Sequence, residues 1–212
     1  SLKNPYAISD DEQQIIYWMH QFNDPELFND DPLTDYAVFF NTQGIAFVAV
    51  YYGLIKLINN PLLIFKLLSF IFVSLSSVFI FKIGRKLKNV RTGMLLTTLF
   101  LIFLPLMGVI NGFYKNFGMI LFIIFYYFYI SNKYFYSLLV TILVSLFYAP
   151  MTLVCLTLLS FSMLDFKNKP VYLTKNKKKI YLFLITALLC LIIVGSTTLF
   201  RDKTQFGHLT SF

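Results

Sequence analysis

The chain has 212 residues, of which 58% are hydrophobic and only 13% charged. Soluble globular domains carry about 25% charged residues, so this composition excludes a disordered chain, a coiled coil and an ordinary water-soluble enzyme, and it requires a bilayer to cover the excess apolar surface. The formal net charge of +8 does not indicate a nucleic-acid partner, because the acidic and basic residues occupy different parts of the chain.

Residues 1–60 are predicted to form an acidic extracytoplasmic loop with amphipathic, interfacial helices. Eight of the ten acidic residues of the chain fall within its first 35 positions. The apolar stretch 44–58 is short for a span and ends in Asn59, Asn60 and Pro61, which fits a helix lying at the outer interface. The alternative, a true span, would move the following basic linker to the outer side.

Six apolar runs follow and predict an all-α, polytopic transmembrane bundle of about six helices within residues 61–200. The runs cover 62–83, 93–110, 113–130, 134–149, 151–165 and 180–199. A spanning helix needs about 20 apolar residues, with a floor near 17, so 134–149 and 151–165 are marginal. Because Pro150 separates these two runs, we expect a tight hairpin of short or tilted helices there. Residues 201–212 would begin a further extracytoplasmic segment.

The basic residues predict the orientation of this bundle. They concentrate in the linkers near 82–91 and 166–179, with Lys133 in the short turn between them. Cytoplasmic connections of membrane proteins carry an excess of Lys and Arg. The run 62–83 is therefore expected to pass from the outside to the inside, which leaves the acidic N-terminal region outside.

The predicted site lies in this acidic region, where Ser9, Asp10, Asp11 and Glu12 are adjacent. Ser9 and Glu12 have the spacing of a capping box, which gives Glu12 a structural explanation. A cap needs one oxygen and does not explain Asp10 and Asp11. A carboxylate at a helix start beside a membrane can accept a proton from an incoming hydroxyl. It can also help to hold a divalent cation, the one cofactor we consider, with Asp10 and Asp11 as its ligands.

Further charged residues are expected to support this site. Asp30 and Asp31 can face the same cavity, although Asp31 before Pro32 is also a signal for a turn or a helix start. On the outer side of the bundle, Lys115 lies between two apolar runs. It is either an anchor that snorkels to lipid phosphate or a clamp on a substrate phosphate, and Arg201 lies on the same predicted side.

The predicted spans hold no charged residue deep in the bilayer, and this argues against an ion-coupled transporter. Cys155 and Cys190 lie inside apolar runs. We interpret them as small core residues rather than as a disulfide or a metal site.

These features resemble the GT-C superfamily, whose members are polytopic glycosyltransferases that use polyprenyl-phosphate-linked sugars. The resemblance rests on the step Asp11-Glu12, on the stretch from there to Asp24-Pro25-Glu26-Leu27-Phe28 and Asp30, on the basic Lys82-Ile83-Gly84-Arg85-Lys86, and on Gly112-Phe113-Tyr114-Lys115-Asn116-Phe117. It covers most of the chain through short motifs.

The resemblance implies an inverting sugar transfer on the extracytoplasmic face of a bacterial plasma membrane, from a polyprenyl-phosphate-linked sugar to a glycan, lipid or protein acceptor. It implies Asp11 as the general base that deprotonates the acceptor, Asp10 or Glu12 as the residue that orients the acceptor or binds a metal, and Lys115 as the contact to the lipid phosphate. The first helix, the later helices and a soluble C-terminal domain of such enzymes are absent, so we expect a piece of a larger protein.

Two other functions compete with this one. A flippase for lipid-linked glycans should carry polar or charged residues along its spans, and this chain carries few. A scaffold subunit could bind a partner through the acidic loop, but it would not need carboxylates beside a basic outer turn. The sequence therefore favours the enzyme.

Overall fold

The structure is a computed structural model, and it describes residues 16–28, 31–34, 44–104, 113–165, 172–173 and 176–199. These residues form an all-α fold with one pair of two-residue strands, which confirms the predicted class. The elements in chain order are the 3-10 helix η1 (Tyr17–Phe22), α3 (Ile45–Ile58), α4 (Pro61–Leu87), α5 (Val90–Phe103), α6 (Tyr114–Ile130), α7 (Tyr134–Phe147), α8 (Ala149–Phe161), β1 (Leu164–Asp165), β2 (Tyr172–Leu173) and α9 (Lys177–Leu199).

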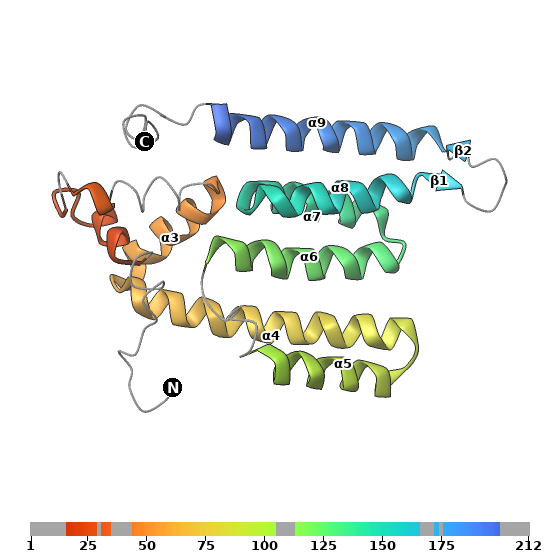
Figure 1. Cartoon of the computed structure of the whole chain (residues 1–212), viewed down its shortest axis with the longest axis horizontal. Coiled ribbons are helices and arrows are strands. Elements are labelled where there is room, and N and C mark those ends of the chain that lie inside the picture. Colours follow the sequence, from red (N-terminus) through yellow and green to blue (C-terminus); the bar gives the residue numbers. More distant parts are fainter. Residues whose placement is uncertain are drawn as a thin grey trace, which may run out of the picture.

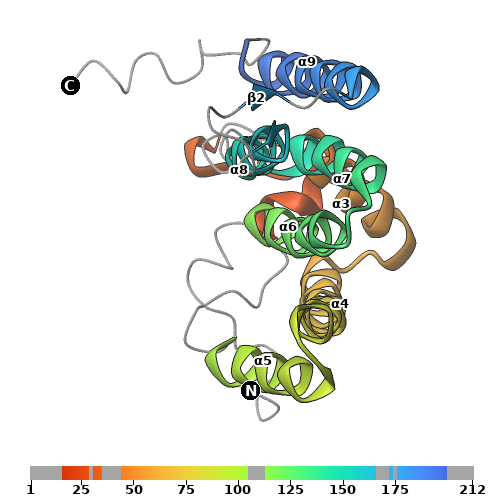
Figure 2. The ribbon, with the colours of Figure 1, turned by 90° about the vertical axis from the view of Figure 1, so that its right-hand side faces the viewer.

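The helices α4 to α9 lie side by side with their axes roughly along one direction (Figure 1). Seen end-on, they follow one another in the order α5, α4, α6, the pair α7 and α8, and then α9 (Figure 2). Each helix contacts its neighbour in this order. Successive helices reverse direction, so the chain connections alternate between the two ends of the bundle.

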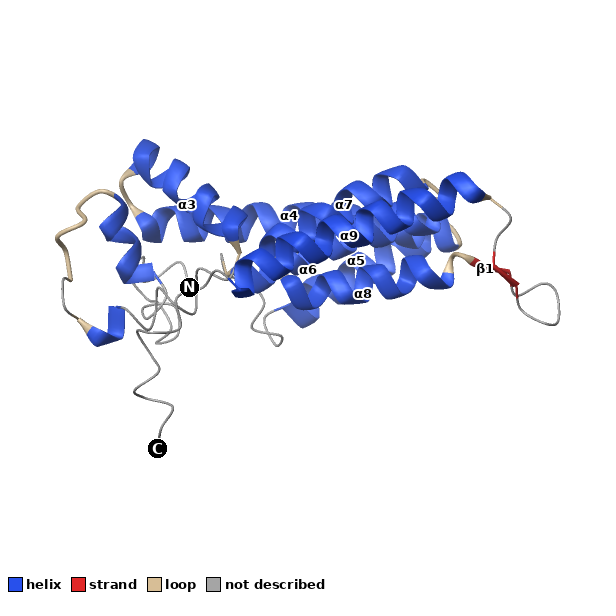
Figure 3. Ribbon diagram, turned by 90° about the horizontal axis from the view of Figure 1, so that it is seen from above, coloured by secondary structure: helices blue, strands red, loops and turns tan. Residues whose placement is uncertain are grey.

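The two ends of the bundle differ in charge. One end carries the connections α4–α5, α6–α7 and α8–α9, and we call it the basic end. It is defined by eight exposed cations, which are Lys82, Arg85, Lys86, Lys88, Arg91, Lys133, Lys177 and Lys178. The opposite end, the η1 end, carries η1, α3, the first turn of α6 and the α7–α8 turn (Figures 1 and 3). Of the described acidic residues, Asp24, Glu26 and Asp31 belong to the η1 end and Asp165, in β1, belongs to the basic end.

Asparagine side chains mark the boundaries of the first bundle helices. The Asn60 Oδ1 atom accepts the Leu63 N–H at 3.0 Å, and Pro61 occupies the first position of α4. The Asn89 Oδ1 atom accepts the Thr92 N–H at 2.9 Å at the start of α5. These side chains satisfy N–H groups that have no partner within the helix.

The predicted hairpin at Pro150 is confirmed. One residue, Tyr148, separates α7 from α8, and its backbone is extended, with φ −152° and ψ 95°. The chain runs along α7 toward the η1 end and returns along α8, so the two helices are antiparallel (Figure 1). A β-carbon on Gly118 of α6 would lie 2.7 Å from the Tyr148 Cβ. The glycine therefore lets the α7–α8 turn rest directly on α6.

Two predicted boundaries were wrong at the basic end. Helix α4 continues to Leu87, so Lys82, Arg85 and Lys86 belong to its last turns and not to a linker. Helix α9 begins at Lys177, so the last lysines of the predicted 166–179 linker are helical. Lys and Arg are good helix formers, and cations at the end of α4 complement its dipole. The antiparallel pair β1–β2, which joins Leu164 to Leu173, was not predicted.

The helices differ in length. Of the described helices, Pro61–Leu87 and Lys177–Ser196 are long and apolar enough to cross a bilayer. The other apolar helices have between 13 and 17 residues, or about 20–26 Å at 1.5 Å per residue, against about 30 Å for the hydrocarbon core. Large apolar side chains such as Leu101 and Leu191 are exposed on short and long helices alike.

The core consists of two clusters of buried side chains. The first joins η1, α3, α4 and α6 at the η1 end and includes Phe47, Tyr51 and Phe117. The second joins α6, α7 and α8. The single tryptophan of the chain, Trp18, is 2% exposed in the first cluster, its ring centroid lies 5.3 Å from that of Phe22, and its Nε1 has no acceptor among the described residues.

Candidate functional site

The structure describes only two of the predicted site residues, Asp31 and Lys115. The predicted catalytic pair Asp10 and Asp11, the supporting residues Glu12 and Asp30, and the predicted phosphate contact Arg201 all lie outside the described residues. Their roles therefore stay predictions. The described residues contain no group of three His, Cys, Asp or Glu side chains that could hold a metal ion.

Asp31 caps the short helical turn that begins at Pro32. Its Oδ2 accepts hydrogen bonds from the Thr34 hydroxyl at 2.7 Å and the Thr34 N–H at 3.1 Å, and its Oδ1 accepts the Leu33 N–H at 3.3 Å. The hydrogen bond from the Thr34 side chain is the main cause that lowers the pKa of Asp31 below its ordinary value of 3.8, with smaller contributions from the two backbone N–H groups. These contacts confirm the predicted helix-start signal.

The turn at Asp24 also has the structure that the sequence predicts. The Asp24 Oδ1 atom accepts the Glu26 N–H at 3.2 Å, and Gln21 donates a side-chain hydrogen bond to the Leu27 carbonyl at 2.8 Å. A carboxylate that bonds to the backbone two residues on forms an Asx turn. The side chains of Asp24 and Asp31 are therefore occupied with local backbone structure.

Aromatic contacts attach this acidic segment to the bundle. The ring centroids of Tyr17 and Phe28 lie 5.4 Å apart within the segment. The ring centroid of Phe22 lies 5.6 Å from that of Tyr52 on α3. The Thr34 hydroxyl also lies 3.1 Å from the Tyr17 hydroxyl. The segment is thus held against α3, and α3 is held against α4 and α7.

Phe117 joins the first turns of α6 to the same cluster. Its ring centroid lies 4.5 Å from that of Phe72 on α4, 4.7 Å from that of Phe147 at the end of α7, and 5.8 Å from that of Phe47 on α3. Such pairs stabilise beyond the apolar area that they bury. The α6 start that carries Lys115 therefore shares one packed unit with η1 and α3.

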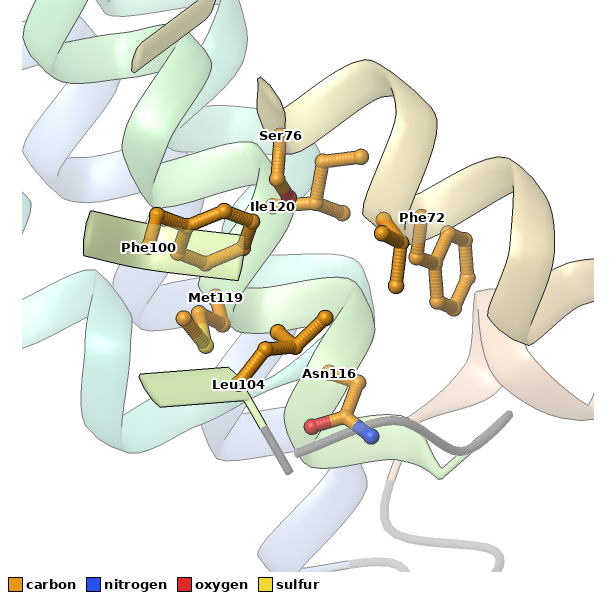
Figure 4. A pocket seen from close by; sticks show the side chains of 8 residues that line it. Phe72, Ser76, Phe100, Leu104, Asn116, Met119 and Ile120 are labelled. Carbon is orange, nitrogen blue, oxygen red and sulfur yellow. The ribbon is translucent and has the colours of Figure 1, made fainter. Parts of the chain in front are cut away.

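An apolar cleft opens beside this unit, between α4, α5 and α6 (Figure 4). The space that the cleft encloses has room for about one water molecule, and its empty volume of about 250 Å³ includes the open solvent at its mouth. The lining residues are Phe72, Val73, Ser76, Phe100, Leu104, Asn116, Met119 and Ile120. Two polar side chains contribute to the lining: Ser76, which is 5% exposed and directs its hydroxyl into the cleft, and Asn116 at one end (Figure 4).

Lys115 precedes Asn116, which lines that end of the cleft. It is exposed in the first turn of α6, next to Asn116 and four residues before Met119. Residues four apart lie on the same face of a helix. Lys115 is therefore one turn beyond Met119 on the face that lines the cleft, at the η1 end of the molecule.

The sequence interpretation missed the cleft. Ser76 and Asn116 are 40 positions apart in the sequence and come together only because α4 and α6 pack side by side. The available signal was the group of serines in the middle of an otherwise apolar run, since polar residues inside such runs point to a function.

In comparisons with known proteins, no family model, curated protein or solved structure matches the chain.

Proposed function

We propose that the chain is the membrane-embedded helix bundle of a glycosyltransferase that moves a sugar from a polyprenyl-phosphate donor to an acceptor at the η1 end. The observation that carries the proposal is the position of Lys115. This cation is exposed in the first turn of α6, next to Asn116 of the cleft lining, and α6 begins at the same end of the molecule as η1 (Figure 1). A polyprenyl phosphate carries an anionic group at the end of an apolar chain. A cation next to an apolar surface can therefore contact both parts.

The bundle suits a bilayer in three respects. Helices α4 and α9 have the length and composition of spans, large apolar side chains face outward, and eight of the eleven exposed cations of the described residues lie at one end. The positive-inside rule then assigns the basic end to the cytoplasm and the η1 end to the outer face. The shorter helices beside α4 can be accommodated by local thinning of the bilayer. Helix α3, which lies across the η1 end (Figure 3), suits an interfacial position.

The proposed chemistry combines Asp11, which the sequence predicts as the base, with Lys115 of α6. In the proposed step, Asp11 accepts the proton of the acceptor hydroxyl, and the acceptor oxygen forms a bond to the anomeric carbon of the sugar. The bond from that carbon to the phosphate oxygen breaks, and the lipid phosphate leaves with the electron pair. Lys115 would stabilise the negative charge that develops on the leaving phosphate.

A transfer assay tests the proposal. The protein is reconstituted in vesicles and supplied with polyprenyl-phosphate hexoses and membrane acceptors, and product formation is measured. Asp11→Asn should abolish transfer, because an amide cannot accept the proton. Lys115→Gln should lower kcat/KM by about 100-fold. Lys56→Gln, a change of another exposed lysine of the η1 end, is the matched control and should leave transfer unchanged.

Two results would contradict the proposal. Unchanged turnover in Asp11→Asn would remove the base. Movement of intact donor across the vesicle membrane without formation of a new glycosidic bond would assign the flippase function instead.

A further inference from the structure

The basic end of the molecule concentrates positive charge. Among the side chains that the structure describes, no carboxylate forms an ion pair with any of its eight exposed cations. Of the acidic residues in the described ranges, only Asp165, in β1, belongs to this end (Figure 1). A concentration of positive charge attracts anionic partners.

Aromatic rings accompany the cations at this end. The Lys82 Nζ lies 5.0 Å from the ring centroid of Phe79 and 5.9 Å from that of Tyr127 on α6. The Lys133 Nζ lies 5.9 Å from the ring centroid of Tyr136 on α7. Aromatic side chains concentrate where a bilayer meets water, with cations next to them at the level of the lipid headgroups.

Helix α4 continues the pattern beyond Lys82. Arg85 and Lys86 follow it by three and four residues, so these three cations share one face of the last turns. Phe79 precedes Lys82 by three residues on the same face. The face thus changes from aromatic to cationic along the helix axis, in the direction that leads out of the bundle.

Lys179 has a different role at the same end. Its Nζ donates a hydrogen bond to the Ser162 carbonyl at 2.8 Å and lies 4.8 Å from the ring centroid of Tyr134. It thereby joins α7, the end of α8 and α9. This internal contact holds the neighbouring Lys177 and Lys178, which are exposed, beside the other connections of the basic end.

We propose that the basic end binds the headgroups of anionic phospholipids. The charge is spread over three connections at one end of the bundle and is bordered by aromatic rings, which fits a lipid surface better than a compact protein partner. Juxtamembrane clusters of Lys and Arg bind anionic lipids in this way. The inference rests on the membrane placement in the proposed function and is independent of the sugar transfer.

Lipid selectivity in vesicles tests this inference. The full chain is incorporated into phosphatidylcholine vesicles, and spin-labelled phosphatidylglycerol and phosphatidylcholine are compared by the motionally restricted fraction in their electron paramagnetic resonance spectra. At low salt the protein should retain phosphatidylglycerol at least about threefold more strongly, and 1 M NaCl should largely remove the preference because exposed charges are screened.

Paired variants assign the effect to the basic end. Arg85→Gln/Lys86→Gln should reduce the preference, whereas Lys56→Gln/Lys66→Gln removes the same charge at the η1 end and should reduce it less. Equal retention of both lipids, or equal losses in the two double variants, would overturn the inference. Displacement of the labelled lipid by soluble polyglutamate would overturn it in favour of an acidic protein partner. Failure of sugar transfer would leave the lipid result unaffected.

Discussion

Gly84 of α4 faces Gly93 of α5 at backbone contact. A β-carbon on Gly84 would lie 2.7 Å from the Gly93 Cα, and one on Gly93 would lie 2.7 Å from the Phe81 carbonyl oxygen. One turn further along α5, the Thr97 hydroxyl lies 2.9 Å from the Gly93 carbonyl of its own helix and 3.5 Å from the Ser77 carbonyl of α4. Small residues allow helices to approach this closely, which is the packing mode favoured between helices in membranes.

Gly84→Ala should therefore destabilise the protein by about 1–3 kcal/mol, since the added methyl meets backbone atoms that cannot rotate away. Thermal unfolding in mild detergent, followed by circular dichroism, measures the change. Gly53→Ala is the matched control, because a β-carbon there would meet nothing within 4 Å, and it should stabilise α3 by about 0.5–1 kcal/mol. Equal effects of the two changes would contradict the close contact of α4 and α5.

Removal of the Phe117 ring should loosen the η1 end. Phe117→Ala deletes three ring contacts in the first core cluster and should cost about 3–5 kcal/mol. Limited proteolysis should then cut the η1 and α3 segments before the rest of the bundle. Phe70→Ala, which removes a ring that is 73% exposed, should change stability by less than about 1 kcal/mol. A larger loss in the second variant would contradict the assignment of the core.

The carboxyl group of Asp31 should titrate below its ordinary pKa of 3.8. Because the folded-state pKa is lowered, the carboxylate contributes its full stabilisation above pH 3.8, and this contribution is lost as the pH falls further through the folded-state value. Thr34→Val removes the hydroxyl hydrogen bond and should move the pKa of Asp31 upward. Carbon NMR of labelled Asp side chains measures it.

A change elsewhere serves as the control for this titration. Thr157→Val removes a hydroxyl that bonds to the Leu153 carbonyl at 2.8 Å on the exposed surface of α8, and it should leave the pKa of Asp31 where it is. An unchanged pKa in Thr34→Val would show that the cap does not control the titration.

Cysteine labelling tests the orientation in the membrane. Glu26→Cys at the η1 end should react with a membrane-impermeant maleimide in intact cells, whereas Lys88→Cys at the basic end should react only after permeabilisation. The native Cys155 and Cys190 are buried, at 0% and 1% exposure, so the maleimide should react little with them. The opposite pattern would invert the orientation, and equal labelling of both positions would contradict the membrane placement.

The helices of the bundle could be predicted because strong local signals bound them. Asn60 and Pro61 start α4, and Pro150 separates α7 from α8. The end of α4 was predicted too early because a charged residue ends an apolar run without ending a helix. The pair β1–β2 depends on contacts across a connection, which a two-residue strand does not reveal in its sequence.

The candidate site was less accessible to prediction than the helices. The sequence allowed two roles for Asp31, a helix start and a part of the site. The structure shows that its carboxylate oxygens accept hydrogen bonds from Leu33 and Thr34 at the start of a helical turn. The position of Lys115 next to an apolar cleft depends on the packing of α4, α5 and α6, and no local pattern contains it. The sequence could identify Lys115 as a candidate residue, but the side chains around it could be named only from the folded structure.

The burial of Trp18 has a practical consequence. Since this is the only indole in the chain, tryptophan fluorescence, excited where the 14 tyrosines do not absorb, reports on a single place, the junction of η1 with the bundle. Detachment of that junction would expose the ring to water and shift its emission to longer wavelength, while melting of the distant α8–α9 region would leave the signal unchanged. One optical measurement on the unmodified protein can thus separate release of the N-terminal segment from melting that is confined to α8 and α9.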